Sequence, residues 1–76
     1  MVPQSDAGLP ALSVVVPVFR AEETLGELHR RLTAVLGDSA EAYEIVLVDD
    51  RSDDGSWALI EDLAAQDPHV RGMRLG

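Results

Sequence analysis

Short runs of consecutive apolar residues along the chain predict strands. Leu12–Val18 (LSVVVPV) is a short run rich in β-branched residues, typical of a strand buried on both faces of a parallel sheet. Because proline has no N–H to donate, we expect strand pairing to end at Pro17 and a loop to begin there. Tyr43–Val48 (YEIVLV) predicts a second strand. A third at Val70–Leu75 is less strongly indicated, because Gly72 and two arginines interrupt it.

Apolar residues at helical spacing predict two helices between these strands. The first runs from Glu22 to Leu36 and ends at Gly37, with one apolar stripe made of Leu25, Leu28, Leu32, Val35 and Leu36. The second runs from about Ser56 to Gln66, with Ser56 as a candidate N-cap and Asp67-Pro68 as its end. Its core face contains Trp57, Ile60, Leu63 and Ala64.

The predicted order is therefore β-α-β-α-β, which indicates an α/β fold with three parallel strands and right-handed crossovers. Residues 1–10 are rich in Pro, Gly, Ser and Asp, and we expect a flexible tail there, followed by one structured unit over residues 11–76. A three-stranded sheet leaves an edge uncovered, so we expect more protein to follow Gly76, and self-association through that edge is a second way to cover it.

Composition narrows the classes of function. The 76 residues contain no cysteine, which excludes disulfides and thiolate metal sites. The net charge of −8 argues against nucleic acid as a partner. Residues 1–10 lack the features of a signal peptide, and the apolar run at residues 14–19 is too short to span a bilayer. We expect a cytoplasmic location.

Two loops are candidates for a ligand site, because ligands of open parallel sheets bind beyond the carboxyl ends of the strands. These loops are Pro17–Glu22 and Asp49–Gly55, and they should lie side by side if their strands are neighbours. Asp49 and Asp50 directly follow an apolar strand, and such carboxylates can accept hydrogen bonds from a base or a ribose, or hold a metal.

The other polar and aromatic residues have simpler interpretations. Ser52, Asp53 and Asp54 are explained more readily as caps of the second helix. Phe19 could pack against a nucleobase or belong to the core, and the sequence leaves both open. Trp57 is expected in the core. His29 and His69 lack metal-ligand spacing and are expected on the surface.

Two binding or signalling modules compete for the acidic segment. Residues 50–61 match an EF-hand calcium loop at several positions, but a calcium loop of this kind must follow a helix and this one follows a strand. A receiver-like phosphorylation domain would have its acidic pair after the first strand, whereas here a strand and a helix come before it. Both alternatives fit the order of elements less well than a parallel α/β unit with a ligand site at its strand ends.

Two segments at the expected separation resemble the start of a family 2 glycosyltransferase with the Rossmann-like GT-A fold. Leu12–Leu25 (LSVVVPVFRAEETL) is similar to the opening "SVVIPVYNEEENL", and Glu44–Ser56 (EIVLVDDRSDDGS) is similar to "EIIVVDDGSTDGT". The resemblance covers about residues 11–76. It is greatest to polyprenyl-phosphate sugar transferases of the dolichol-phosphate mannose synthase type.

The resemblance implies roles for residues in both loops. Pro17 and Phe19 would line the nucleotide pocket, with Phe19 beside the base. Asp50 would accept a hydrogen bond from the base, and Asp49 would support the same loop. Arg20 and Ala21 stand where the family usually has Asn and Glu, so Glu22 is the candidate substitute for that glutamate, one residue displaced. Arg51 replaces a common glycine and is expected to alter the turn.

The resemblance also implies the chemistry of the whole protein. It would transfer a sugar, with inversion, from a UDP- or GDP-sugar to a polyprenyl phosphate or a glycan, with association to a membrane if the acceptor is a lipid. The family's DxD motif, which holds Mg²⁺ or Mn²⁺, and its catalytic base are not among these residues. We therefore expect the chain to be the nucleotide-binding N-terminal fragment, with no catalytic or metal-binding residue of its own and no activity alone.

Overall fold

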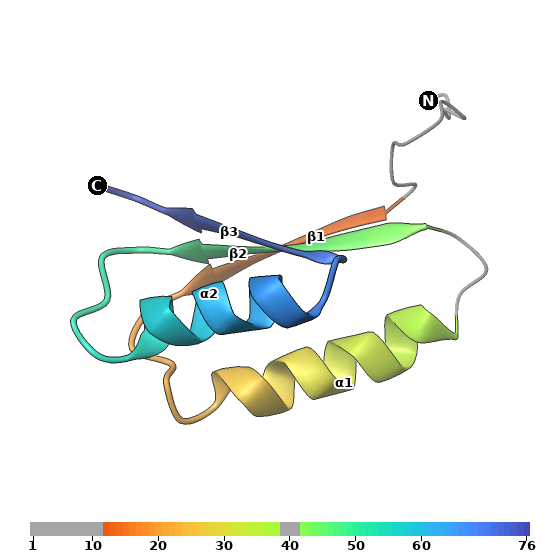
Figure 1. The fold of residues 1–76 in the computed structure, drawn as a ribbon, viewed down its shortest axis with the longest axis horizontal. Helices are drawn as coiled ribbons and strands as arrows, with labels where there is room; N and C mark the ends of the chain where they lie inside the picture. Colours follow the sequence, from red (N-terminus) through yellow and green to blue (C-terminus); the bar gives the residue numbers. More distant parts are fainter. Residues whose placement is uncertain (1–11, 39–41) are drawn as a thin grey trace.

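The computed structural model describes residues 12–38 and 42–76. Within them the elements follow the predicted order β-α-β-α-β, as Figure 1 shows. Their bounds are β1 Leu12–Val18, α1 Leu25–Gly37, β2 Tyr43–Asp49, α2 Ser56–Gln66 and β3 Val70–Arg74. The tail predicted over residues 1–10 lies outside the described residues.

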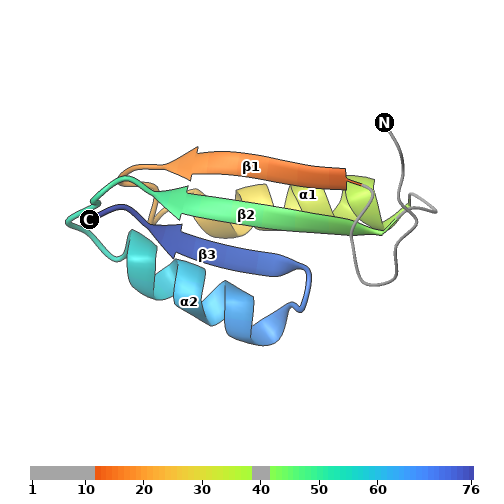
Figure 2. The same cartoon turned by 90° about the horizontal axis from the view of Figure 1, so that it is seen from above.

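The three strands form one parallel sheet in the order β1-β2-β3. Both helices lie on the same face of this sheet (Figures 1 and 2). Right-handed crossovers that step twice in the same direction across a sheet return on the same side, which explains this arrangement. The predicted α/β fold class, with three parallel strands and two helices, is confirmed.

The core lies between the sheet and the two helices. It contains Val18, Leu25, Ile45, Leu47, Ile60 and Val70, all buried. Position 72 in β3 leaves no room for a side chain, because a Cβ there would lie 2.5 Å from the Ile60 Cγ2 of α2. The glycine that weakened the sequence evidence for β3 is therefore what allows α2 to pack closely on that strand.

The second face of the sheet is open within the described part of the chain. Val15 is 62% exposed and Met73 is 54% exposed, and their side chains stand on the face away from the helices. The expectation that Leu12–Val18 is buried on both faces is therefore wrong for this structure, because one-directional winding puts both helices on one side. β1 and β3 are the edge strands of the described sheet, and self-association through an edge stays a prediction.

Two boundaries differ from the prediction. Pairing does not end at Pro17, since β1 continues to Val18 opposite Asp49. The N–H of Leu12 points toward β2, donating to the Ala42 carbonyl, and strand geometry gives the odd-numbered residues the opposite direction. The nitrogen of Pro17 therefore faces the open edge, where no donor is required.

The first helix also differs in detail. It begins at Leu25 rather than Glu22, because residues 20–22 are bonded to the loop after β2. Leu28 and Val35, which belong to the predicted stripe, are exposed, whereas Leu32 and Leu36 pack on the core. Neither helix of the described segments is long and apolar enough to cross a membrane.

Candidate functional site

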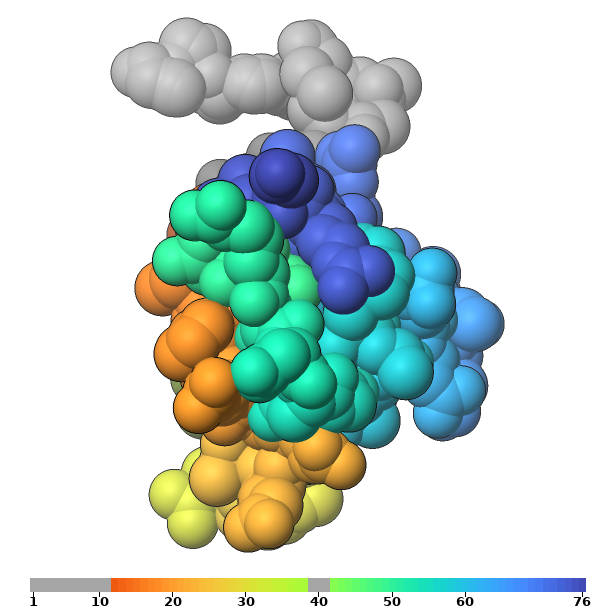
Figure 3. Space-filling model, turned by 90° about the vertical axis from the view of Figure 1, so that its left-hand side faces the viewer, coloured from red at the N-terminus to blue at the C-terminus, as the bar shows by residue number. Residues whose placement is uncertain are grey.

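The loops after β1 and β2 meet at the carboxyl end of the sheet. Figure 3 looks onto this end and shows the orange segment after β1 packed against the green segment after β2. The predicted juxtaposition of residues 17–22 and 49–55 is present, because several hydrogen bonds join the two loops directly. Parallel neighbouring strands of equal length bring their ends to the same edge, which is where open α/β sheets bind ligands.

Phe19 and Asp50 are both exposed, each at the residue that follows the end of its strand. The Asp50 N–H donates to the Val18 carbonyl at 2.9 Å, so Asp50 lies across from the residue that precedes Phe19. Phe19 is 58% exposed, which makes it a surface aromatic and not a member of the core. An accessible aromatic ring and an accessible carboxylate thus stand at adjacent strand ends, and together they offer a stacking surface and a hydrogen-bond acceptor.

Asp49 has the opposite environment from its neighbour Asp50. Its side chain is fully buried on the helix-facing side of β2. One carboxylate oxygen, Oδ2, accepts a hydrogen bond from the Ser52 N–H at 3.3 Å and lies 3.5 Å from the Nε of Arg74. The other oxygen, Oδ1, has no partner among the described residues. Asp49 therefore supports the loop after β2 from the protein interior through its bond with Ser52. The guanidinium of Arg74 also lies over the Trp57 ring, 5.5 Å from its centroid.

Arg20 and Arg51 occupy the two strained positions of the loops. Their φ angles are 51° and 59°, in the left-handed region that most side chains avoid. Arg51 therefore adopts a backbone conformation that a glycine would adopt readily. The guanidinium of Arg20 pairs with Asp53 at 2.8 Å and lies over the Phe19 ring at 5.3 Å. These two contacts place a positive charge next to the exposed aromatic.

Two buried serines join the loops. The Ser52 hydroxyl oxygen accepts the Arg20 N–H at 2.9 Å, and the Ser56 hydroxyl oxygen accepts the Ala21 N–H at 2.8 Å. The prediction that Ser56 caps α2 is wrong: Gly55 is the N-cap residue, and Ser56 is the first residue of the helix. Its hydroxyl bonds the neighbouring loop instead.

Asp54 and Glu22 accept hydrogen bonds from backbone N–H groups at the start of α2. Asp54 accepts the Ser56 N–H at 2.9 Å, which agrees with the interpretation of Asp54 as a helix-terminal residue. The hydrogen bond with the Ser56 side chain is the main cause that holds the pKa of Asp54 below its usual value. Glu22 accepts the Gly55 N–H at 2.8 Å. The structure thus places Glu22 against the second loop, beside the predicted site.

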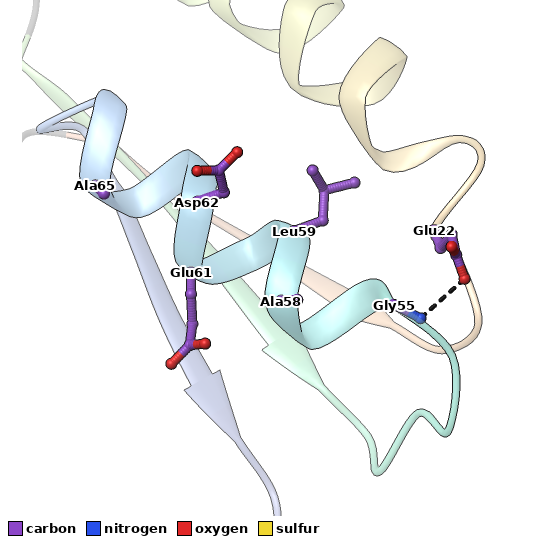
Figure 4. A pocket seen from close by; sticks show the side chains of 7 residues that line it. All are labelled: Glu22, Gly55, Ala58, Leu59, Glu61, Asp62 and Ala65. Atoms are coloured by element: carbon purple, nitrogen blue, oxygen red, sulfur yellow. Dashed lines mark hydrogen bonds between the residues drawn. The ribbon is translucent and has the colours of Figure 1, made fainter.

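A hollow of about 730 Å³ lies along the outer side of α2, as Figure 4 shows. It is lined by Glu22, Gly55, Ala58, Leu59, Glu61, Asp62 and Ala65. The dashed line in Figure 4 is the bond between Glu22 and Gly55, two of the lining residues. Most of its lining comes from α2, so it is separate from the exposed pair Phe19 and Asp50 at the strand ends.

The histidines lie elsewhere. His29 is not a surface residue as predicted: it is half-buried, with Nε2 2.8 Å from the Asp67 Oδ2. His69 is exposed as predicted and stacks on the Tyr43 ring at 4.0 Å. Across the described ranges, no three His, Asp or Glu side chains are grouped so that they could hold a metal ion. The acidic segment follows β2 rather than a helix, which removes the structural basis of the EF-hand alternative.

Sequence reasoning missed the roles of Ser52, Ser56, Arg20 and Arg74. A serine before or within the first turn of a helix looks like a cap, and only the tertiary structure shows that these hydroxyls face another loop.

Comparison with known proteins agrees with the two motifs. Residues 13–76 match the model of glycosyl transferase family 2. The chain is 52% identical over 56 residues to an undecaprenyl-phosphate 4-deoxy-4-formamido-L-arabinose transferase of Pseudomonas fluorescens, covering 74% of this chain and 16% of that protein. It is 41% identical over 71 residues to the protein of that name from Aeromonas hydrophila, covering 93% of this chain and 21% of the relative. The chain thus spans about a fifth or less of the length of these relatives.

The matched region begins one residue into β1 and includes both loops at the strand ends. It therefore contains the exposed pair Phe19 and Asp50 and the loop junction that supports it. The chain belongs to glycosyl transferase family 2.

Proposed function

We propose that residues 11–76 form the nucleotide-binding part of the donor site of a sugar transferase. Phe19 packs against the base of a nucleotide-sugar, Asp50 accepts a hydrogen bond from that base, and Pro17 borders the pocket. Asp49 supports the loop from the protein interior. The observation that carries this proposal is the exposed pair Phe19 and Asp50, brought together by the bond from the Asp50 N–H to the Val18 carbonyl.

The physical chemistry of the pair suits a nucleotide base. Every base presents an aromatic face that can stack on Phe19 and a ring or exocyclic N–H that can donate to a carboxylate. The adjacent guanidinium of Arg20 would add attraction for a bound anion, although Asp53 neutralises part of its charge. Glu22 reaches the same end of the sheet, and its carboxylate is already bonded to the Gly55 N–H. We propose that Glu22 shapes the border of the site.

The whole protein, in this proposal, transfers the sugar to a polyprenyl phosphate. The relatives' names specify an undecaprenyl-phosphate acceptor, and the closeness of the match favours the same class here. An acceptor phosphate oxygen would form a bond to the anomeric carbon as the bond from that carbon to the nucleoside diphosphate breaks, with inversion. Because a polyprenyl phosphate resides in a bilayer, we propose that the protein works at the cytoplasmic surface of a membrane.

The family generally uses a divalent metal ion. The described residues of this chain do not fit such a site: Asp49 is enclosed by protein, Asp50 stands alone, and no three suitable side chains converge. We propose that Mg²⁺ or Mn²⁺, and the residues of the chemical step, are held elsewhere in the whole protein.

The proposal is tested by nucleotide binding to Phe19→Ala and Asp50→Asn variants of the whole protein. Stacking of one base on an aromatic side chain contributes about 1–3 kcal/mol, so Phe19→Ala should weaken the affinity for UDP or GDP at least about fivefold. Asp50→Asn should weaken it by about tenfold, because it removes a charged acceptor. Isothermal titration calorimetry measures both, and melting temperatures should stay near that of the wild type because both side chains are exposed.

Matched controls separate binding from general charge or surface effects. Asp62→Asn removes an exposed carboxylate from α2, and Leu12→Ala truncates an exposed apolar residue at the far end of β1. Neither should change nucleotide affinity by more than about twofold. Wild-type affinity in both Phe19→Ala and Asp50→Asn would sink the proposed site.

A further inference from the structure

The hydrogen bonds of Ser52 and Ser56 cross between two loops that are far apart in the sequence. Ser52 accepts the N–H of Arg20, 32 residues away, and Ser56 accepts the N–H of Ala21, 35 residues away. The two donors are consecutive residues of the loop after β1. Both serine side chains are enclosed, with 5% and 0% of their surface exposed. Two adjacent backbone groups of one loop are therefore fixed by two buried acceptors from the other.

Neither serine is the N-cap residue of α2. The N-cap is Gly55 and makes no side-chain cap, while the Ser56 N–H is satisfied by Asp54 and the Gly55 N–H by Glu22. Alanine at position 56 would keep the bond from that backbone N–H to Asp54 and would be a better helix former than serine, while the side-chain contact with Asp54 would be lost. The loss would fall on the N–H groups of Arg20 and Ala21, which would then lack an acceptor in a partly buried position.

The loop held in this way carries the exposed aromatic. Arg20 directly follows Phe19 and has a φ angle of 51°, a conformation that requires support from its surroundings. The support is a short series of bonds: buried Asp49 accepts the Ser52 N–H, and the Ser52 hydroxyl accepts the Arg20 N–H. The direction in which the chain leaves β1, and hence the place of Phe19 beside Asp50, depends on this series.

We propose that Ser52 and Ser56 are positioning residues of the nucleotide site. Their hydroxyl oxygens fix the backbone of residues 20 and 21, so that Phe19 stands ready to pack on a base that Asp50 also contacts. The serines touch neither base nor sugar in this proposal, which rests on the proposed function of Phe19. Binding then requires less ordering of the loop, and affinity rises because the site is formed in advance.

The test is a double-mutant cycle between Ser52 and Phe19 in the whole protein. Ser52→Ala alone should weaken UDP or GDP affinity about three- to tenfold, the size expected for a lost hydrogen bond that orders a loop. In a Phe19→Ala background the same serine substitution should weaken affinity less than about twofold, because the side chain that it positions is gone. A role limited to fold stability would not produce this coupling. Ser56→Ala should give the same pattern.

Two further variants keep the test clear. Ser52→Thr retains a hydroxyl acceptor and should restore most of the wild-type affinity, even if Ser52→Ala or Ser56→Ala melts too low for titration. Ser13→Ala is the matched control, because Ser13 also uses its hydroxyl in a contact between strands, at 2.6 Å from Glu44, but is exposed and far from the loops. Its affinity should match the wild type.

The possible results are distinct. Wild-type affinity in folded Ser52→Ala and Ser56→Ala, or an equal loss with and without Phe19, overturns the positioning role while leaving the nucleotide site in place. A loss of affinity in Ser52→Thr as large as in Ser52→Ala also overturns it. Failure of the wild-type protein to bind either nucleotide overturns the proposed function and this inference with it.

Discussion

The two ends of the sheet are tied together by different chemistry. At the carboxyl end, the loops are joined by buried serine hydroxyls that accept backbone N–H groups, and two side chains suited to ligand contact, Phe19 and Asp50, are left exposed. At the amino end, Asp67 joins α1 to the turn before β3 by contacts with His29 and His69, at 2.8 and 3.1 Å. At this end, one carboxylate and two imidazole rings are bonded to one another.

The carboxyl end thus leaves Phe19 and Asp50 accessible, whereas the amino end is a junction of polar side chains that are bonded to one another. Buried neutral hydroxyls fix the backbone at the carboxyl end without adding charge, and the carboxylate of Asp50 stays exposed there. The other charges at this end are engaged within the protein, as in the pair of Arg20 with Asp53. Charged and imidazole groups at the amino end are engaged by each other, which makes that junction sensitive to pH instead. The comparison can be tested by removing one anchor from each end and measuring stability and binding separately.

The largest expected effect on stability follows from Asp49→Ala. This substitution removes the buried acceptor of the Ser52 N–H and leaves that group unsatisfied, at a cost of about 2 kcal/mol in the free energy of unfolding. Nucleotide affinity should fall as well, because Ser52 then loses its support. Urea denaturation of the whole protein measures the first effect and calorimetric titration the second.

The adjacent carboxylate supplies the control for Asp49. Asp50→Ala removes an exposed side chain and should change the free energy of unfolding by less than about 0.5 kcal/mol while still weakening nucleotide binding. Equal destabilisation by the two substitutions would contradict the division between a buried support and an exposed ligand contact.

The contribution of Asp67 at the amino end to the free energy of unfolding should depend on pH. Burial raises the pKa of Asp67, but hydrogen bonds from the His69 N–H and from the two histidine rings outweigh burial, and the pKa lies below its usual value. A carboxyl whose pKa is lowered by folding stabilises the native state above its unfolded pKa of about 3.9, and that contribution disappears as pH falls through the folded pKa. Asp67→Asn should therefore destabilise the protein by about 1 kcal/mol at pH 7.

The measurement is the difference in unfolding free energy between Asp67→Asn and the wild type from pH 7 to pH 3. The difference should be constant above about pH 5 and shrink below about pH 4, the window set by the lowered pKa of a carboxyl. Asp62→Asn, which removes an exposed carboxylate from the helix that Asp67 terminates, should show no such trend. A difference that is independent of pH would mean that Asp67 acts through packing or a neutral hydrogen bond.

Much of the fold could be predicted because each element carries its own local pattern. The apolar runs rich in β-branched residues indicated the first two strands, and the apolar spacing together with Asp67-Pro68 indicated a helix from about Ser56 to Gln66, close to the observed α2. The burial of β1 on one face only could not be predicted in this way, since it depends on the direction in which the sheet is wound. Pro17 misled for a similar reason: a missing N–H ends a strand only if that N–H would face a partner, and the sequence does not say which side faces out.

The meeting of the two loops was predictable, but the hydrogen bonds between them were not. Two loops at the ends of neighbouring strands must meet, so residues 17–22 and 49–55 could be paired from topology alone. The serine hydroxyls accept N–H groups that lie 32 and 35 residues earlier in the chain, and local sequence patterns do not reveal such distant partners. Ser56 was therefore interpreted as a helix cap. His29 looked like a surface residue because its partner, Asp67, lies 38 residues away.

The smallest expected effect distinguishes two roles of Glu22. Its carboxylate accepts the Gly55 N–H, and the amide oxygen of a glutamine can accept the same bond. Glu22→Gln should therefore keep the free energy of unfolding within about 0.5 kcal/mol of the wild type, whereas Glu22→Ala should lose about 0.5–1 kcal/mol of it. If Glu22 shapes the site only through this bond, nucleotide affinity should also be unchanged in Glu22→Gln. A tenfold loss of affinity in Glu22→Gln with unchanged stability would instead show that the negative charge itself contacts the ligand, and Glu22 would then join Phe19 and Asp50 as a direct contact.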